Sequence, residues 1–589
     1  MHGFYGRILN IDATNKQSSI ETVPDSVYRT YLGGKGLGTW LLYEKNPPKI
    51  DPAAPENCMI FAMGPVSGTR VWGSSRYGVF TKSPLTGFYS ESYSGGRVPE
   101  AIDSTGFDAI VIKGRSAEPT VLAVHPEGVE FHDAGDLWGM DTFETECVVG
   151  KRHTHSGEGF RRPGVVVIGP AAENGVRFSI IKNDGWRCAG RTGVGTVMGS
   201  KRIKAIVFQG DRTRPLYDEP AVRELSRQFI AKNRNHPAVK AYQARGTSQM
   251  VKVMNTANAF PTRYWAESRF NKWEQISGDA LHERCRVRPH ACAKCLMACG
   301  RMTEVAHGRH AGLKIEGPEY ETIYVFGGLC MIDSIEEIIY LNHLCDLLGL
   351  DTITAGNMCA FAIEAARRGK IDYPIDYGDA EAIAGLLKLI VRKQGVGQVL
   401  AMGIRYAAAQ WGLEDIAVHS KGMEPAGYDP RVLKGMGLAY AVSDRGACHL
   451  RATFYKPELS GMIPPDQIHD KAKLFIDFED RLTLFDTMIL CRFYRDLYGW
   501  EELGQVIHAT TGIPSDINNL REIAGAVTDL ARRFNLREGL VPEDDRLSKG
   551  LHRKLKNSNS YLSETDLQYM VNDYYRLRGW DEAGRPASV

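Results

Sequence analysis

Short apolar runs bounded by glycine or proline dominate the first third of the chain. They occupy residues 58–65, 109–114, 120–125, 165–170 and 204–210. Runs of this length between turn residues are typical of buried β-strands. The pattern therefore predicts a β-rich first domain that ends near Asp211.

Beyond Asp211 the apolar residues recur at intervals of three and four, which is the period of an α-helix. One helix is predicted from Glu336 to the terminating glycine Gly349, and the next begins after Asp351, whose carboxylate can cap it. We therefore predict an α+β multidomain protein. Its β-rich domain covers residues 1–211, and two mainly α-helical domains cover residues 212–420 and 421–589.

Composition narrows the class of protein. The chain has 589 residues, more than usually fold around a single hydrophobic core, so more than one domain is expected. Its formal net charge of +2 is smaller than the basic excess typical of proteins that bind nucleic acids. The N-terminus lacks a signal-peptide pattern, and no stretch approaches the ~18 apolar residues of a membrane span. Twelve cysteines in such a chain fit reduced thiols and metal ligands better than disulfides. We expect a cytoplasmic enzyme that binds neither nucleic acid nor membrane.

Four cysteines stand out by their spacing. Cys292, Cys295 and Cys299 form a C-x2-C-x3-C run, and Cys491 lies far downstream. Three close thiolates and one distant thiolate match the ligand set of an iron–sulfur cluster. The alternatives are buried core cysteines or a structural zinc site. Zinc sites usually add a second close pair, and the following segment offers only His307 and His310, in an unusual spacing.

Glycine-rich segments indicate where a phosphate could bind. The segments that begin at Gly33 and Gly193 satisfy neither dinucleotide nor phosphate-loop motifs, so we interpret them as tight turns. Arg76 precedes a second kind of segment, Ser94-Gly95-Gly96, whose backbone amides could form an anion nest. Another glycine-rich turn carries Arg187 and Arg191. Together these segments favour a phosphorylated cofactor held from both sides.

A succession of motifs runs from the first residues almost to the last. They read LGGKGLGTWLL, SRYGVFTKSPLTGF, YSGGR, IGPAAENGVRFS, NDGWRCAGRTGVGTVMGSK, CAKCLMACGR, EGPEYET, DLLGLD, DRGACHL and YYRLRGW. In this order and spacing the chain resembles the tungsten-containing aldehyde:ferredoxin oxidoreductases. The resemblance implies a tungsten bis-pyranopterin (tungstopterin), one [4Fe-4S] cluster and a Mg²⁺ ion that joins the pterin phosphates. In this family the pterins, and not the protein, supply the sulfur ligands of tungsten.

The resemblance also implies roles for individual residues. The four cysteines match the cluster ligands, and Arg76 matches an arginine between cluster and pterin. Tyr93 and Cys188 match positions whose main-chain carbonyls hold Mg²⁺, beside the Ser94-Gly95 and Arg187 segments. The two pterin motifs match residues 346–351, with Asp346, Leu350 and Asp351, and residues 486–491, with Asp486, Leu490 and Cys491. Ile489 replaces the glycine of the second motif, and Arg451 stands where a lysine is usual.

Two residues match the family's catalytic pair. Glu321 closes EGPEYE and His449 lies in DRGACHL. Oxidation of an aldehyde to an acid adds an oxygen from water and releases two electrons and two protons. A carboxylate that accepts a proton and an imidazole that polarises the carbonyl suit this reaction. The remaining cysteines Cys330, Cys345, Cys359 and Cys448 are expected to pack in the core.

Three functions remain open at this point. The first is aldehyde oxidation, with electrons leaving through the cluster to ferredoxin or a ferredoxin-like iron–sulfur subunit. The second is the catalytic subunit of a tungsten-dependent benzoyl-CoA-type reductase, which would need room for a CoA thioester. The third is an electron-transfer module without catalysis. We also expect an oligomer, and any use of a nicotinamide would require a further flavin-bearing subunit, because the chain has no dinucleotide fingerprint.

Overall fold

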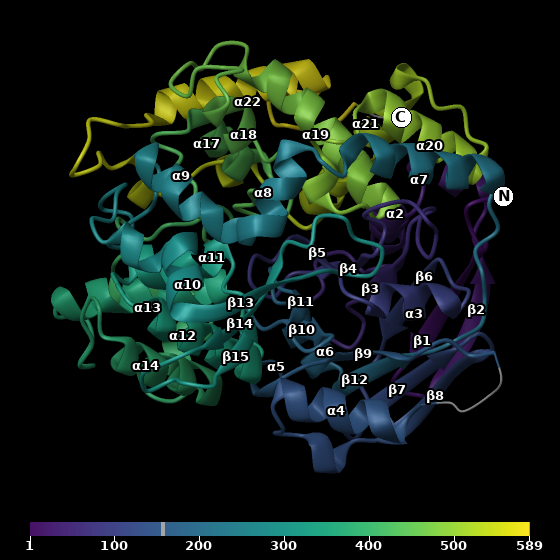
Figure 1. Ribbon diagram of the computed structural model, residues 1–589, viewed down its shortest axis with the longest axis horizontal. Helices are drawn as coiled ribbons and strands as arrows, with labels where there is room; N and C mark the ends of the chain where they lie inside the picture. The colour runs from purple at the N-terminus through teal and green to yellow at the C-terminus, as the bar shows by residue number, and fades with distance from the viewer. Residues whose placement is uncertain (155–158, 588–589) are drawn as a thin grey trace.

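The computed structural model describes residues 1–154 and 159–587. Figure 1 shows a β-rich N-terminal part, in purple and blue, packed against the mainly helical rest of the chain. The predicted α+β fold class is confirmed. The division into three domains at residues 211 and 420 stays a prediction.

Two six-stranded sheets build the N-terminal part. The first has the order β2-β1-β6-β3-β4-β5 and is antiparallel except between β1 and β6. The five runs predicted as strands all form strands. The bounds in the first sheet are β1 Arg7–Asp12, β2 Gln17–Thr22, β3 Met59–Ala62, β4 Tyr77–Lys82, β5 Tyr89–Ser94 and β6 Ala109–Lys113.

The second sheet has the order β11-β10-β9-β12-β7-β8, and only β12 and β7 run parallel. Its outer edge is the β7–β8 hairpin, visible low in Figure 1. Its other edge, β11, lies beside β5 of the first sheet. The bounds are β7 Thr120–His125, β8 Gly128–Asp133, β9 Gly164–Val167, β10 Ile181–Asn183, β11 Arg187–Ala189 and β12 Ile203–Phe208.

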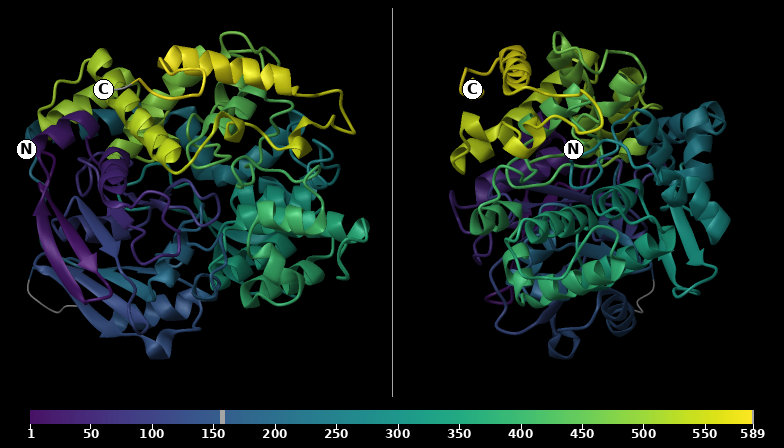
Figure 2. Two further views of the ribbon diagram at one scale, coloured as in Figure 1. Left: turned by 180° about the vertical axis from the view of Figure 1, so that it is seen from behind. Right: turned by 90° about the vertical axis from the view of Figure 1, so that its left-hand side faces the viewer.

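A shared core joins the two sheets. The rings of Phe61 on β3 and Phe208 on β12 lie 5.7 Å apart, within one apolar cluster drawn from both sheets. Helix α4 covers the far side of the second sheet. The views in Figure 2 show the sheets from behind and from the side. The helices of this part are α1 Asp25–Tyr31, α2 Gly34–Lys45, α3 Val98–Ser104, α4 Thr142–Arg152, α5 Pro170–Glu173 and α6 Val194–Ser200.

The middle third is mainly helical but also contains a three-stranded antiparallel sheet that the apolar pattern did not predict. Its strand β13 reads CRVRPH and is mostly exposed, so it lacks the apolar run used to find strands. The strands are β13 Cys285–His290, β14 Gly300–Val305 and β15 Lys314–Glu316. The helices are α7 Glu219–Asn233, α8 Pro237–Arg245, α9 Met250–Thr256, α10 Gly278–Arg284, α11 Tyr320–Ile323, α12 Ile335–Leu348, α13 Thr352–Arg367, α14 Ala380–Arg392, α15 Val396–Leu400 and α16 Ile404–Trp411.

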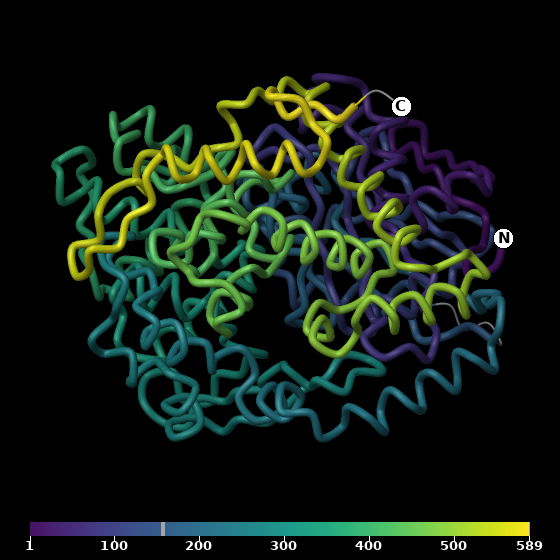
Figure 3. Tube along the Cα trace, turned by 90° about the horizontal axis from the view of Figure 1, so that it is seen from above, coloured from purple at the N-terminus to yellow at the C-terminus, as the bar shows by residue number. Residues whose placement is uncertain are grey.

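The last third of the chain packs against the first sheet. Side chains from α19 and α21 share an apolar cluster with α2 and with the outer face of β3 and β4. In Figure 3 the final helix α22, in yellow, crosses the top of the molecule. Among the described residues, no helix is long and apolar enough to cross a membrane. The helices are α17 Lys434–Val442, α18 Tyr455–Leu459, α19 Lys471–Met488, α20 Trp500–Thr511, α21 Ile517–Arg537 and α22 Glu564–Arg578.

Candidate active site

The four cysteines of the predicted cluster line one cavity of about 210 Å³. Three come from the loop between β13 and β14, and Cys491 follows α19, so distant segments meet here. Within the described residues, no three His, Cys, Asp or Glu side chains are arranged around a single metal ion. The assignment of these cysteines to an iron–sulfur cluster stays a prediction. His310, one of the two histidines weighed for a zinc site, pairs with Glu337 at 3.1 Å.

Polar contacts reach these sulfur atoms from the protein. The Tyr494 hydroxyl donates to Cys295 Sγ at 3.5 Å and accepts from the Leu296 amide at 2.7 Å. Arg76 Nη1 lies 4.0 Å from Cys491 Sγ. Burial raises the pKa of Cys295, so this thiol stays protonated until a metal displaces the proton.

The same cavity is also lined by the predicted pterin-side residues. Tyr93, Ser94, Gly95, Arg187 and Cys188 all line it. A Cβ on Gly95 would stand only 3.0 Å from the Cys292 sulfur, so the absence of a side chain makes room for the Cys292 thiol. The strands β5 and β11, which lie side by side, thus carry both predicted carbonyl positions to one place.

Asn183 lies on β10, beside β11, and its side chain bonds to β4 and to the end of β5; it was not singled out from the sequence. Its side-chain oxygen accepts from the hydroxyls of Tyr77 at 3.0 Å and Ser94 at 2.7 Å, and its amide nitrogen donates to the Gly95 carbonyl at 2.9 Å. A single buried asparagine looks like any loop residue in the sequence. Its partners are 88 to 106 residues away, so only the fold reveals this role.

The first predicted pterin motif forms the end of α12 and the start of α13. Asp346 accepts from Lys182 Nζ at 2.7 Å and from Asn342 at 2.8 Å. Asp351 caps α13, as predicted, by accepting from the amides of Ile353 and Thr354. Leu350 is buried. One carboxylate of the motif is therefore held by a lysine, and the other stabilises a helix terminus.

The second motif ends α19 and lies in a buried cluster of charges. Asp486 accepts from Arg492 Nε and from Arg451 Nη1, each at 3.0 Å. Arg451 Nη1 also donates to Glu91 on β5, which lies 3.4 Å from Lys35. Burial alone would raise the pKa of Glu91, but the positive charges of Arg451 and Lys35 lower it below the usual value.

Ile489, which replaces the glycine of the second motif, keeps the backbone geometry that Gly349 has in the first motif. Gly349 ends α12 at φ 78° and ψ 43°, and Ile489 ends α19 at φ 63° and ψ 46°. Both positions are left-handed, a conformation that β-branched residues rarely adopt. Gly34, in the first glycine-rich segment, packs directly against this turn, because a Cβ there would lie 2.3 Å from the Asp486 carbonyl. The prediction of a tight turn is wrong for most of this segment, because from Gly34 on it forms the first turns of α2; the segment at Gly193 likewise continues as α6 from Val194.

Gly349→Ala should destabilise the protein by about 1–2 kcal/mol, the cost of a left-handed non-glycine residue, and should lower Tm by about 1–2 °C in a chain of this length. The new Cβ would also stand 3.1 Å from the Gly169 amide nitrogen. Gly369 is the matched control because it follows α13 at φ 66° with no atom within 4 Å. Calorimetry should show a smaller loss for Gly369→Ala; equal losses would contradict the crowding at Gly349.

The predicted catalytic residues lie together. Glu321 Oε1 is 3.6 Å from His449 Nε2, and Glu321 Oε2 accepts from the Gly427 amide at 3.0 Å. Oε1 itself has no hydrogen-bond partner in the described structure. The imidazole of His449 stacks on Tyr428, with 5.7 Å between ring centroids. Glu321 belongs to α11, which continues into a π-helical turn at Tyr324–Leu329, an irregularity frequent at functional sites.

The surroundings set the charge of this pair. Burial raises the pKa of Glu321 to about 8. Burial and the positive charges of Arg445 and Arg191 lower the pKa of His449 well below its usual value. At neutral pH the pair is thus mainly a carboxylic acid beside a neutral imidazole, and the carboxylate form of Glu321 predominates above pH of about 8.

Other buried groups surround the pair, and among them Glu424 and Arg445 were missed by the sequence analysis. Arg191 donates to the Glu424 carbonyl at 2.6 Å and lies 3.4 Å from Asp351. Burial raises the pKa of Glu424 to about 7, and one of its oxygens has no partner in the described residues. Cys448 is buried as predicted, but its sulfur accepts from Arg445 at 2.9 Å. Burial would raise the pKa of this thiol, but Arg445 and neighbouring arginines lower it to about 6.

Several buried donors have no acceptor within the described protein. They include Arg187 Nε, Arg191 Nε, Arg445 Nε, Arg451 Nε and Nη2, and Arg492 Nη1. An unsatisfied buried donor is costly, so such groups usually meet a ligand or ordered water. Guanidinium groups match phosphate and the oxygens of a pterin ring. The residues present therefore fit an anionic pterin cofactor.

A four-thiol cavity, a basic cofactor cradle and a buried acid–imidazole pair on this fold define a redox metalloenzyme. The chain belongs to the aldehyde ferredoxin oxidoreductase family of tungsten enzymes. The family model described as the N-terminal domain of aldehyde ferredoxin oxidoreductase matches residues 8–210, and the model for domains 2 and 3 matches residues 224–588.

Curated relatives agree with this assignment. The chain is 34% identical to the tungsten-containing aldehyde ferredoxin oxidoreductases of Pyrococcus furiosus and Thermococcus kodakarensis, over 99% of this chain and 98% of each relative. It is 27% identical to the WOR-like subunit of an aliphatic sulfonate oxidoreductase from Pyrococcus furiosus, over 100% of this chain and 96% of that subunit.

A solved structure supports the fold. The active-site complex BamBC of benzoyl coenzyme A reductase, with 1,5-dienoyl-CoA, matches with a TM-score of 0.85, covering 100% of this chain and 96% of that one. Its sequence identity of 22% supports the fold alone.

Proposed function

We propose that this protein oxidises aldehydes to carboxylic acids with a tungstopterin cofactor and passes the electrons through a [4Fe-4S] cluster to ferredoxin or an iron–sulfur subunit. The observation that carries the proposal is the pairing of Glu321 with His449 at 3.6 Å. Neither electron transfer nor cofactor binding alone requires a buried, unpartnered carboxyl oxygen beside an imidazole.

Named residues would hold the cofactors. Cys292, Cys295, Cys299 and Cys491 would bind the cluster, with Arg76 beside it. Asp346 and Asp486 would face the two pterins, each motif flanked by its leucine, Leu350 or Leu490. The main-chain carbonyls of Tyr93 and Cys188 would hold Mg²⁺, and Arg187 and Arg451 would approach the pterins. When bound, the tungsten centre supplies the two-electron redox chemistry.

The protein's own residues would bind and orient the aldehyde. His449 is neutral and can donate one N–H to the aldehyde oxygen, which polarises the carbonyl. The free Oε1 of Glu321 can take a proton from water or from the aldehyde carbon once the carboxyl is ionised. The Gly427 amide fixes the other carboxyl oxygen, so the acceptor oxygen keeps its orientation toward His449.

The first test is metal analysis combined with two assays on anaerobically purified protein. We expect about one tungsten and about four irons per chain, in line with one cofactor and one cluster, together with viologen-coupled oxidation of benzaldehyde. The control substrate is an aryl-CoA thioester with a low-potential reductant. Aryl-CoA reduction without aldehyde oxidation would favour the benzoyl-CoA-type reductase, and iron without tungsten would contradict both enzymes.

A further inference from the structure

A large hollow lies directly behind the cluster cavity. It measures about 1030 Å³ and is lined by the 68–72 loop, by α7 and by Lys294 of the cysteine loop. Trp72 lines this hollow, and the next residue, Gly73, lines the cluster cavity and accepts from the Cys491 amide at 2.9 Å. The hollow and the predicted cluster cavity therefore share a wall at residues 72 and 73.

The hollow is strongly basic. Six of its lining residues are Arg or Lys and two are acidic. Of these, Arg214 is buried between Asp103 and Asp108, which leaves five cations against Glu219. The whole chain has a net charge of only +2, so this excess is local. The exposed cations are Arg70, Arg223, Arg227 and Lys294.

Neighbouring carboxylates neutralise this charge only weakly. Arg223 pairs with Glu219, Arg227 with Glu224 and Lys294 with Glu100, but these cations are 59%, 78% and 40% exposed, and such surface pairs contribute little. Arg70 is exposed, and its guanidinium has no hydrogen bond or ion pair within residues 1–154 and 159–587. The surface therefore keeps a positive field that an acidic partner can use.

A packed aromatic path connects α7 with the cluster cysteines. Phe229, on the inner side of α7, stacks on Tyr498 at 4.3 Å and lies 5.9 Å from Tyr494. The hydroxyl of Tyr494 donates to Cys295 Sγ. Helix α7 lies beside α20 on the outside of the molecule, as Figures 1 and 3 show. The aromatic rings of Phe229 and Tyr494 thus connect α7, which carries the basic side chains on its outer side, to the predicted cluster ligand Cys295.

We propose that this basic hollow is the docking surface for an acidic one-electron carrier protein, which takes electrons from the adjacent cluster. The proposal rests on the proposed function for the source of electrons. One aldehyde and one water give one carboxylic acid, two protons and two electrons, so two carrier molecules are each reduced by one electron per turnover. A transient complex of this kind needs only a small interface and gains its speed from electrostatic attraction.

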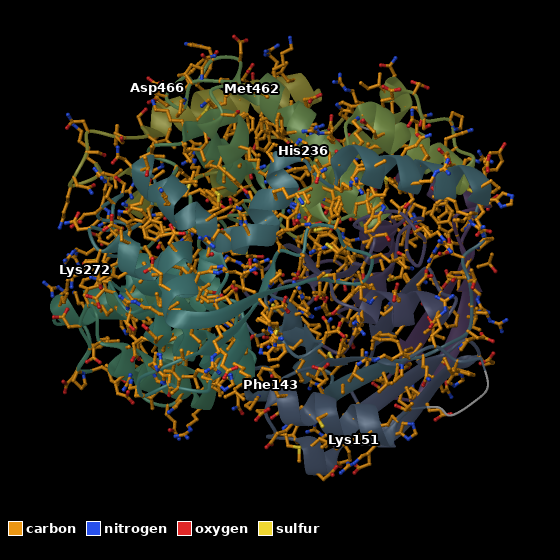
Figure 4. All side chains as sticks on the ribbon, viewed as in Figure 1. Phe143, Lys151, His236, Lys272, Met462 and Asp466 are labelled. Carbon is orange, nitrogen blue, oxygen red and sulfur yellow. The ribbon has the colours of Figure 1, made fainter. Side chains whose placement is uncertain are left out.

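The test is a triple charge reversal on this surface, Arg70→Glu, Arg223→Glu and Arg227→Glu. None of these residues belongs to the proposed catalytic or cofactor site. The matched control is Lys151→Glu, Lys272→Glu and Lys370→Glu, which changes the net charge equally. Figure 4 labels Lys151 on α4 and Lys272 at the far edge of the helical part, both away from α7.

The probe is a purified acidic [4Fe-4S] ferredoxin, and binding is measured by titration calorimetry at low ionic strength. We expect its Kd to rise about tenfold or more in the test variant, with less dependence on salt, and to change little in the control. In turnover, KM for ferredoxin should rise equally while the viologen-coupled rate stays unchanged. Equal Kd values for test and control variants would overturn the docking proposal.

The two readouts separate the two proposals. If the parent protein binds ferredoxin through this surface but oxidises no aldehyde with viologen, the docking surface stands and the proposed reaction fails. If aldehyde oxidation with viologen is normal and the charge reversals leave ferredoxin binding unchanged, the reaction stands and the docking surface is wrong.

Discussion

Glu321→Gln should lower kcat for aldehyde oxidation about 10²- to 10⁴-fold, the usual contribution of a general base. Glutamine keeps the shape of the side chain and can still accept from the Gly427 amide, as Glu321 Oε2 does at 3.0 Å. It cannot take up a proton at the position of Oε1, which faces His449. Viologen-coupled rates measure the loss, and tungsten and iron analyses should show unchanged cofactor content.

The pH profile tests the same assignment. Because the pKa of Glu321 is raised to about 8, the ionised base becomes scarcer about tenfold per pH unit below that value. The rate of the parent enzyme should therefore rise with pH and level off above about pH 8, whereas the residual rate of Glu321→Gln should lack this dependence. An unchanged kcat, or a variant that keeps the rising limb, would contradict a base at Glu321.

Regular patterns allowed much of the fold to be predicted. The helix expected from Glu336 to Gly349 exists as α12, and Asp351 caps α13, because capping chemistry depends on neighbours in sequence. The cavity shared by Cys292 and Cys491 depends on a contact across almost 200 residues. Spacing predicted the ligand type for Cys292, Cys295 and Cys299, and the distant Cys491 was proposed as the fourth thiolate and then matched by the family resemblance.

Buried charged residues were the main omission. Glu91 on β5 is fully buried, yet an acidic residue within a strand usually indicates a solvent-facing position. Its partners Lys35 and Arg451 lie on α2 and on the His449 loop, far away in sequence. Lys182 beside Asp346 is a second example. Such residues become recognisable only when the fold brings opposite charges together.

Arg451→Met should be among the most destabilising single substitutions, by up to about 3–5 kcal/mol, because it removes the cation that two buried carboxylates share and leaves Glu91 with Lys35 and Asp486 with Arg492. Arg451 contacts both Glu91 and Asp486 and thereby joins β5 to the end of α19. Its Nε and Nη2 have no partner among the described residues, so its loss should also reduce tungsten content. The measurements are Tm by calorimetry and tungsten per chain.

Two further variants distinguish charge from packing at this position. Arg451→Lys keeps the positive charge and should retain most of the Tm, although it cannot contact two carboxylates with a planar fork. Adding Glu91→Gln to Arg451→Met removes one of the two carboxylate charges and should restore part of the lost stability, because the two residues interact directly. If Arg451→Met melts with the parent protein, or if Glu91→Gln deepens the loss, then the buried charges do not hold β5 against α19. The cofactor site would then have to be positioned by the apolar packing between α2 and α19 alone.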